Sequence, residues 1–422
     1  MLDIKLIREN PLKIKEGCRK KGIDVDVNKL LQLDKKRREF LGEIENLRAE
    51  RNKVSDNIPG ISGEERERLI SQMKKITLKI KEIEPELKEA QEEFIKLMFQ
   101  LPNMPLDDVP EGKNESENQV VRLQGEPPGF CFKPKNHLEI GRSLNLIDTE
   151  RAAKVSGTRF SYLKNEAVLL EFALVHFALD VLTKEGFIPV IPPVMLKKEA
   201  MRSMGYLERG REEVYRTEQD SMYLIGTSEQ SIGPMHMDEI FSAKELPKRY
   251  VAFSTCFRRE AGSYGKDTRG IMRVHQFDKV EMFSFCEPLK SLEEHSYLLS
   301  LEERLVQALK IPYRVIKICS GDLGNPAAAK YDLECWMPGE NKYRETHSTS
   351  NCTDFQARRL NIRYRKEGKK ELEYIHTLNG TALAIGRTIV AILENYQKEN
   401  GSVEIPEVLR PYMGNITEIY PG

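Results

Sequence analysis

The chain has 422 residues, enough for two or three domains with a large core, and its 66 Lys and Arg residues balance 66 Asp and Glu residues. Because there is no net basic charge, any nucleic-acid partner has to be met by local patches. The seven cysteines form no Cys-x-x-Cys pair, which argues against a disulfide framework or a zinc site and favours a cytoplasmic protein with reduced thiols.

Targeting and membrane signals are weak. The N-terminal run Met-Leu-Asp-Ile-Lys is not typical of a signal peptide. The most apolar helical stretch, residues 168–182, is interrupted by Glu171, His176 and Asp180. No segment therefore reaches the length of apolar sequence that a membrane span requires, and we expect no membrane partner.

A heptad pattern predicts two long helices near the N-terminus. Apolar residues recur alternately at three and four positions from Leu69 to Leu101, and a second seam with this spacing runs from Phe40 to Val54. Turn-forming residues fill 55–63 between them. The pattern favours an antiparallel hairpin with a second arm of roughly 50 Å, over two helices packed in a globular bundle. Basic side chains on the first arm could follow a phosphate backbone or simply be solvated.

Residues 102–117 are rich in Pro, Gly and acidic residues and are interpreted as a linker. Beyond it, helices mix with strands joined by hairpin turns, which predicts an α+β domain with an antiparallel sheet flanked by helices. The expected elements are a helix at 168–182, a strand at 186–193, strands at 214–215 and 222–225, strands at 250–258 and 271–285, strands at 331–337 and 342–348, and a strand-to-helix junction at 379–395.

The most informative stretch runs from Phe257 to Glu281 and is typical of a strand, a glycine-bearing loop and a return strand. A cation, an aromatic ring and a carboxylate on one sheet face can hold a phosphate, a flat base and an ammonium or hydroxyl group, although a solvated polar face is the alternative. Arg258 and Glu260 point the same way at the first strand's end. Alternation places on one face of the return strand Arg273, His275, Phe277, Lys279 and Glu281.

Neither a P-loop nor a Gly-x-Gly-x-x-Gly motif is present, so ATP, if bound, would be held by arginines on a sheet. At the junction 379–395, small residues alternate before Arg387, as a backbone pressed against a ligand or a sheet requires. A cation near the positive end of a helix hints at an anionic ligand. Close helix packing with a solvated arginine is the alternative interpretation.

Taken together, these segments resemble class II aminoacyl-tRNA synthetases, and the resemblance to the seryl-tRNA synthetase family covers nearly the whole chain. Residues 186–193 resemble motif 1, residues 257–281 motif 2, and residues 380–387 motif 3. The N-terminal hairpin also resembles that family, as do residues 152–157, 320–324, 350–359 and 408–413.

The resemblance implies a tRNA-binding domain at 1–103 with the coiled-coil hairpin, a linker at 104–125 and a catalytic domain at 126–422. It implies that the chain activates serine with ATP to seryl-adenylate and transfers the seryl group to the 3′ end of serine tRNA, which the hairpin binds mostly by shape and backbone. A cytoplasmic homodimer with 186–193 at its interface is expected, and DNA is not an expected partner.

The resemblance also implies roles for single residues. Arg258 would bridge the α-phosphate and the serine carboxylate, Arg387 and Arg273 would hold the β- and γ-phosphates, and Phe277 would stack under adenine. Arg258 and Arg387 are the expected catalytic residues, and Glu345 with Ser348 would hold Mg²⁺. The expected ATP site comprises Arg258, Arg259, Glu260, Arg273, Val274, Phe277, Glu345, Thr346, His347, Ser348 and Arg387. The expected serine pocket comprises Thr227, Ser228, Glu229, Arg258, Glu281, Asn379 and Thr381.

Two segments depart from the family pattern. The usual Thr-Ala-Glu is Thr-Ser-Glu at 227–229, and the usual Glu-Ile-Ser-Ser is Glu-Thr-His-Ser at 345–348. Alternation would put His347 on the face of Glu345, where it could tune metal or phosphate binding or serve the structure alone. Glu345 and Ser348 are three apart, so they can reach one metal only if the strand bulges between them.

Two other functions fit parts of the sequence. A ligase that charges a carrier protein would resemble the catalytic domain, but such relatives lack the long hairpin. A non-catalytic tRNA-binding paralogue would be expected to have lost part of the catalytic set, yet Arg258, Glu260, Glu281 and Arg387 are all present.

Overall fold

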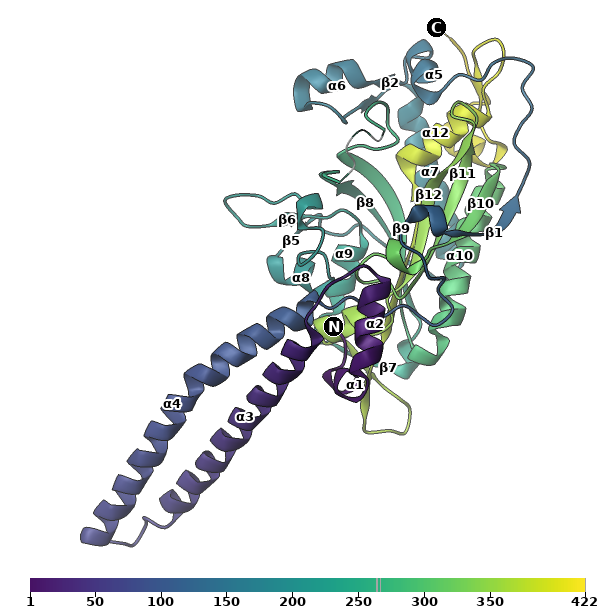
Figure 1. Ribbon diagram of the computed structural model, residues 1–422. Helices are drawn as coiled ribbons and strands as arrows, with labels where there is room; N and C mark the ends of the chain where they lie inside the picture. Colours follow the sequence, from purple (N-terminus) through teal and green to yellow (C-terminus); the bar gives the residue numbers. More distant parts are fainter. Residues whose placement is uncertain (263–264, 266, 422) are drawn as a thin grey trace. The chain divides into compact units, whose positions relative to one another are not determined.

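The computed structural model describes residues 1–262, 265 and 267–421 (Figure 1). Three residues of the loop within 257–281, Ser263, Tyr264 and Lys266, therefore lie outside the described residues. The chain divides into two compact units, Met1–Pro102 and Asn103–Gly422. No helix among the described residues is both long and apolar enough to cross a membrane.

Unit 1 is a helical hairpin on a short helical base. Helices α3 (Val27–Asp56) and α4 (Glu64–Gln100) run side by side and are joined by a short loop (Figure 1). Buried Ile and Val side chains at the predicted seam positions hold the arms together. The antiparallel hairpin is thereby confirmed. The base is formed by α1 (Ile4–Glu9) and α2 (Pro11–Lys20).

Buried Asp34 fixes the base of the hairpin. Its carboxylate is only 1% exposed and accepts from the Arg8 Nε at 2.7 Å. Arg37 and Arg38 of the same helix lie 3.3 and 3.1 Å from it. Burial alone would raise the pKa of Asp34, but the arginines outweigh it and lower the pKa.

Unit 2 is built on an eight-stranded sheet in the order β1-β10-β11-β12-β15-β9-β8-β4. Every neighbouring pair is antiparallel except β4–β8. The antiparallel sheet predicted from the hairpin links is therefore confirmed. The strands are β1 (Gln119–Gln124), β4 (Ile188–Val190), β8 (Lys248–Phe257), β9 (Gln276–Cys286), β10 (Tyr313–Lys317), β11 (Ala329–Met337), β12 (Lys342–Asn351) and β15 (His376–Ala384).

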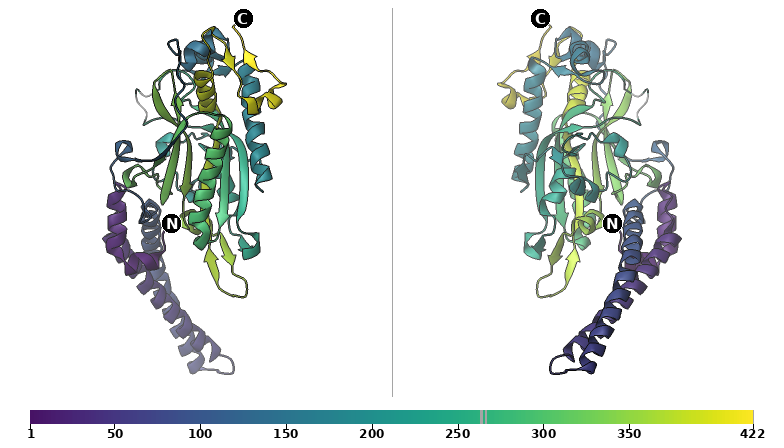
Figure 2. Two further views of the ribbon diagram at one scale, coloured as in Figure 1. Left: turned by 90° about the vertical axis from the view of Figure 1, so that its right-hand side faces the viewer. Right: turned by 90° about the vertical axis from the view of Figure 1, so that its left-hand side faces the viewer.

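Three helices cover one face of this sheet and form the main core with it: α7 (Glu166–Lys184), α10 (Ser291–Ala308) and α12 (Ile385–Asn395). Figure 2 shows α10 and α7 lying alongside the strands. Alternate strand residues such as Val280, Met282 and Leu378 point into this core and are fully buried. The residues between them face the opposite side of the sheet, which these helices leave open.

The remaining elements are short and surround the sheet. A second core packs the small sheet β14-β13-β7 against neighbouring helices. The short helices and strands around the large sheet are α5 (His137–Ser143), α6 (Thr149–Ser156), α8 (Lys198–Ser203), α9 (Glu229–Ile232), α11 (Phe355–Leu360), β2 (Ile147–Asp148), β3 (Tyr162–Leu163), β5 (Met195–Leu196), β6 (Tyr223–Leu224), β7 (Ile240–Ser242), β13 (Arg363–Arg365), β14 (Leu372–Tyr374), β16 (Val403–Glu404) and β17 (Glu418–Ile419).

Two expectations differ from the structure. The segment 104–125, expected to be a linker, belongs to unit 2, because its backbone completes hydrogen bonds there: the Leu106 N–H donates to the Ala328 carbonyl, and β1 pairs with β10. The return strand β9 begins at Gln276 rather than at 271. Arg273 and His275 therefore precede the strand, and the alternation argument does not apply to them.

Candidate active site

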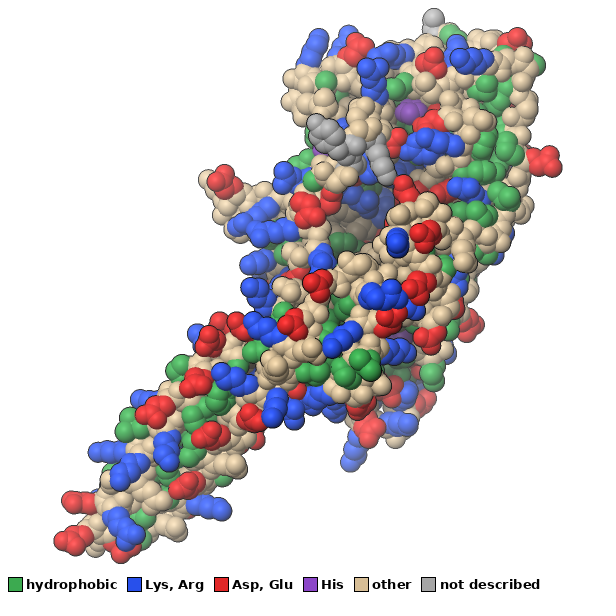
Figure 3. All heavy atoms as spheres, viewed as in Figure 1, with side chains coloured by type: hydrophobic (Ala, Val, Ile, Leu, Met, Phe, Trp, Pro, Cys, Tyr) green, Lys and Arg blue, Asp and Glu red, His purple; other side chains and the backbone are tan. Residues whose placement is uncertain are grey.

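A cavity of about 700 Å³ opens on the uncovered face of the large sheet. Its floor consists of alternate side chains from three neighbouring strands, whose other side chains face the main core. The space-filling view shows a hollow in the upper part of the molecule with Lys and Arg side chains in it (Figure 3). The floor includes Phe277, Lys279 and Glu281 of β9, Ser348 and Ser350 of β12, and Asn379 and Thr381 of β15.

Four arginines line the cavity, Arg209, Arg258, Arg273 and Arg387, and the last three lie at its end around Glu345. The Arg258 guanidinium lies over the Phe277 ring, 5.2 Å from its centroid, and its Nε donates to the Gly226 carbonyl at 3.0 Å. Arg273 Nη1 donates to Glu260 at 2.6 Å. Arg387, near the start of α12, donates from Nε to the Met272 carbonyl and from Nη1 to the carbonyl of Glu345.

These cations surround a carboxylate. Arg387 Nη1 lies 3.3 Å from Glu345 Oε1, and 46% of the Glu345 side chain is exposed. The loss of part of its hydration by itself would raise the pKa of Glu345, but the neighbouring cations, above all Arg387 and Lys330, lower it. The carboxylate is therefore ionised at neutral pH, and the end of the cavity around it is suited to polyphosphate together with a cation.

Strand β12 carries the bulge that the metal assignment requires. Opposite β11, Leu333 pairs with His347 and Glu334 pairs with Glu345, which leaves Thr346 as the extra residue. Glu345 and Ser348 consequently both line the cavity. Among the described residues, no group of three His, Cys, Asp or Glu side chains could hold a metal ion. A carboxylate and a hydroxyl still fit Mg²⁺, which commonly takes its remaining ligands from water and substrate phosphates.

The same bulge turns His347 away from the cavity, so the prediction that it shares the face of Glu345 is wrong. The imidazole is 1% exposed, and its Nδ1 lies 2.8 Å from the Thr346 hydroxyl. Burial lowers the pKa of His347 to about 4, against smaller opposing effects. The residue is a neutral part of the core.

Most of the remaining expected ATP residues line the cavity, namely Glu260, Val274, Thr346 and Phe277. Arg259 does not line this cavity. Its side chain is exposed beside a separate hollow with Tyr215 and Tyr223, because consecutive residues at a strand end point in opposite directions.

The expected serine residues gather at a buried, polar part of the cavity. The Thr227 hydroxyl donates to Glu281, and the backbone N–H of Glu229 donates to the same carboxylate at 3.1 Å. Asn379 and Thr381 lie on the adjacent strand. Ser228 is the exception: its hydroxyl lies 2.7 Å from the Ser254 hydroxyl, and it does not line the cavity.

Glu229 is the most perturbed carboxyl group in this pocket. It is 4% exposed, and its oxygens accept from the Tyr206 hydroxyl at 2.9 Å and from Gln356 Nε2 at 2.6 Å. Burial, followed by the nearby charge of Glu281, raises the pKa of Glu229 to about 7. A bound ammonium group would favour its ionised form.

Sequence reasoning missed several residues of the site. Alternation placed Lys279 on the face of Phe277 and Glu281 but gave it no role, whereas its Nζ lies 2.7 Å from the Thr227 hydroxyl and 2.8 Å from Glu281. Tyr206 and Gln356 come from distant segments and carry no local signal. Lys330, which lines the cavity beside Asp332, was also missed.

Comparisons with known proteins give the context of this site. Residues 1–105 match the Seryl-tRNA synthetase N-terminal domain, and residues 213–396 match the tRNA synthetase class II core domain (G, H, P, S and T). The serine–tRNA ligase of Dictyoglomus turgidum is 49% identical over 100% of both chains, and that of Thermodesulfovibrio yellowstonii is 47% identical over 98% of this chain and 99% of its own.

Solved structures agree with these relatives. The seryl-tRNA synthetase of Pyrococcus horikoshii, complexed with ATP, superposes with a TM-score of 0.93 at 44% identity and covers 100% of both chains. The cytoplasmic serine–tRNA ligase of Naegleria fowleri, in complex with AMP, gives a TM-score of 0.88 at 39% identity over 100% of this chain and 99% of its own. By its full-length similarity, its two matched domains and its fold, this chain belongs to the seryl-tRNA synthetase family.

Proposed function

We propose that the cavity of unit 2 activates serine with ATP and that the chain then transfers the seryl group to tRNA, as a serine–tRNA ligase. The observation that carries this proposal is the division of one cavity into two chemically distinct parts. Arginines surround Glu345 in one part, and a buried set of carboxyl, amide and hydroxyl groups fills the other. Membership of the seryl-tRNA synthetase family supports the same function.

In the first step, an oxygen of the serine carboxylate attacks the α-phosphorus of ATP, the bond from that phosphorus to the bridging oxygen breaks, and pyrophosphate leaves. The serine carboxylate is already a nucleophile, so the protein contributes orientation and charge. Arg258 lies between the two parts of the cavity and contacts the incoming carboxylate and the α-phosphate. Arg273 and Arg387 hold the outer phosphates, and Phe277 stacks on adenine.

Mg²⁺ would be held by Glu345 and Ser348, where it supplies positive charge to the phosphate oxygens. The ionised carboxylate and the bulge that aligns it with the hydroxyl support this assignment. Ser348 also bonds to Asp332 across the strand pair, which fixes the direction of its hydroxyl.

Selection of serine follows from the buried polar pocket. Glu229 and Glu281 receive the ammonium group and the hydroxyl of serine, beside Thr227, Asn379 and Thr381. Alanine would leave these buried groups unpaired, which can discriminate by roughly 10⁴–10⁵-fold. Threonine must be rejected by size instead.

In the second step, a hydroxyl of the 3′-terminal ribose attacks the seryl carbonyl carbon and AMP leaves. The hairpin of α3 and α4 binds the tRNA through backbone and shape, which the basic residues of its first arm support. The cytoplasm is the compartment we infer, and a set of seven cysteines without a Cys-x-x-Cys pair fits it.

A homodimer is part of the proposal. Helix α7, the edge strand β4 and the residue directly after β4 expose large apolar side chains: Leu169 is 46% exposed, Phe172 63%, Ile188 46% and Ile191 84%. Such a patch at a sheet edge suits burial against a second copy. Sedimentation of the native chain as a dimer, and of Phe172→Asp as a monomer, is the expected result. A monomeric native chain contradicts the dimer.

Serine-dependent exchange of labelled pyrophosphate into ATP tests the activation step without tRNA. We expect exchange with serine and far slower exchange with alanine or threonine at equal concentration. An absence of exchange with serine, in a folded protein that binds ATP, would contradict the proposed function and favour the non-catalytic paralogue.

A further inference from the structure

A buried histidine lies against Gly270, three residues before Arg273, and takes no part in the proposed reaction. His137, the first residue of α5, is 6% exposed. Its Nδ1 lies 3.2 Å from Glu394 Oε1, and its backbone N–H donates to the same oxygen at 2.9 Å. Glu394 is completely buried in the last turn of α12, the helix that carries Arg387 near its start.

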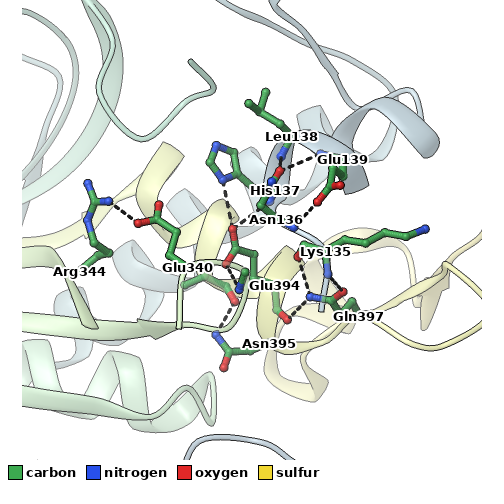
Figure 4. Close-up of polar contacts among 12 residues, drawn as sticks. Lys135, Asn136, His137, Leu138, Glu139, Glu340, Arg344, Glu394, Asn395 and Gln397 are labelled. Atoms are coloured by element: carbon green, nitrogen blue, oxygen red, sulfur yellow. Dashed lines mark hydrogen bonds and ion pairs between the residues drawn. The ribbon is translucent and has the colours of Figure 1, made fainter. Parts of the chain in front are cut away.

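Glu394 is held from a third direction as well. Its Oε2 accepts from the backbone N–H of Gly339, in the turn between β11 and β12, at 2.9 Å. Beside it, Gln397 bonds to both the N–H and the carbonyl of Lys135. Figure 4 shows the His137 ring directed at Glu394, with these contacts around it. The position of the His137 ring is therefore fixed by Glu394, which is itself held by α12 and by the β11–β12 turn.

The other ring nitrogen of His137 points at the loop of the ATP site. With Nδ1 directed at the carboxylate, Nε2 lies on the opposite edge of the ring. Among the described residues, no hydrogen-bond partner is found for Nε2, although it is buried. A Cβ built on Gly270 would lie 2.1 Å from it. Gly270 has φ +84°, and the ring fills the space where any other residue would place its side chain.

The backbone next to this ring, residues 270–272, contacts or precedes arginines of the ATP site. Two residues after Gly270, the Met272 carbonyl accepts from Arg387 Nε at 3.3 Å. Between them, the Ile271 carbonyl packs on Gly386, leaving 3.4 Å to a built Cβ. Arg273 follows immediately and bonds to Glu260 at 2.6 Å. A displacement of residues 270–272 would therefore move two of the arginines assigned to the phosphates.

We propose that His137 is a positioning residue for ATP: held by Glu394, its ring braces residues 270–272, which orient Arg387 and carry Arg273. A second contact secures the other side of the same loop, because Arg344 bridges Asp267 and Glu340 of the β11–β12 turn. The inference rests on the proposed function of the cavity, and it assigns the role to a side chain that does not line the cavity.

The variant His137→Asn removes the contact of the ring with Gly270 while keeping the hydrogen bond to Glu394. An asparagine amide can replace Nδ1 as the donor to Glu394, but it lacks the ring atoms that face Gly270. The matched control is His236→Asn. His236 is also buried and bonds to Glu239 through Nδ1 at 2.7 Å. Its Nε2 lies 2.8 Å from the Tyr250 hydroxyl, and the substitution by asparagine removes this part of the ring as it does in His137→Asn. His236 does not line the cavity.

We expect His137→Asn to raise the KM for ATP in pyrophosphate exchange roughly tenfold, which is about 1.4 kcal/mol, and to leave the KM for serine within about twofold. The Kd for ATP alone should rise by the same factor. His236→Asn should change neither constant. An unchanged ATP affinity in His137→Asn, or equal changes in both KM values, overturns the inference.

Gly270→Ala gives an independent test of the contact. Its new methyl group meets the ring, so ATP affinity should fall, and adding His137→Ala makes room for the methyl group. The double variant should therefore bind ATP less weakly than the product of the two single effects predicts. Independent effects of the two substitutions contradict the contact. Lack of serine-dependent exchange in the native chain would instead refute the proposed function, since ATP binding still reports on His137.

Discussion

Replacing Glu229 by glutamine should make unit 2 more stable at alkaline pH while damaging the serine pocket. The folded chain raises the pKa of this carboxyl from 4.5 to about 7, mainly through burial. At about 1.4 kcal/mol per pKa unit, ionised Glu229 costs the folded state roughly 3 kcal/mol. The side chain is 4% exposed, so solvent screening reduces this little.

The pH at which Glu229 destabilises the folded chain follows from its raised pKa. A group whose pKa is raised on folding favours the folded state when protonated, so its contribution is present at low pH and is lost as pH rises through about 7. Glutamine resembles the protonated form, can accept from Gln356, and can donate to the Tyr206 hydroxyl. The variant therefore avoids this loss.

Thermal unfolding at about pH 5 and about pH 8.5 measures the effect without ligands. The advantage of Glu229→Gln over the native chain should grow by roughly 2–3 kcal/mol between the two, or about 4 °C in melting temperature. Serine-dependent exchange should fall by at least tenfold. The exposed control Glu212→Gln should show neither change. An advantage that is the same at both pH values would refute the reasoning.

Three further predictions concern the division of roles. Arg258→Ala should slow pyrophosphate exchange by roughly 10²–10³-fold or more, while Arg259→Ala, whose side chain lies outside the cavity, should exchange near the native rate; equal effects would remove the role of Arg258. Replacing residues 34–94 by a short loop should preserve exchange and abolish tRNA charging, and parallel loss of both would contradict the separate role of the hairpin. Ser348→Ala should raise the Mg²⁺ concentration for half-maximal exchange severalfold, and an unchanged Mg²⁺ dependence would exclude Ser348 as a ligand.

The parts of the fold that sequence predicts well are those set by local periodicity. The heptad seams fix the hairpin because apolar spacing alone decides which helix faces meet. Alternation correctly placed Phe277, Lys279 and Glu281 on one face of β9, although it gave Lys279 no role in the site. The alternation argument does not apply to Arg273, which precedes the strand; Arg273 lines the same cavity, where it bonds to Glu260.

The parts that sequence did not reveal depend on contacts between distant segments. The bulge at Thr346 reversed the direction expected for His347, and nothing in the residues 345–348 alone shows where the extra residue lies. Tyr206 and Gln356 reach Glu229 from segments 23 and 127 residues away. His137 and Glu394 are 257 residues apart in the sequence, so no local pattern could indicate their contact.

The central claim, that one cavity holds ATP beside serine, is tested most directly by a structure of the chain with a non-hydrolysable seryl-adenylate analogue. The account predicts the seryl ammonium and hydroxyl groups against Glu229 and Glu281, the phosphate substitute against Arg258, and adenine on Phe277. An analogue whose amino acid part lies away from Glu229 and Glu281, or whose adenine lies away from Phe277, would contradict it.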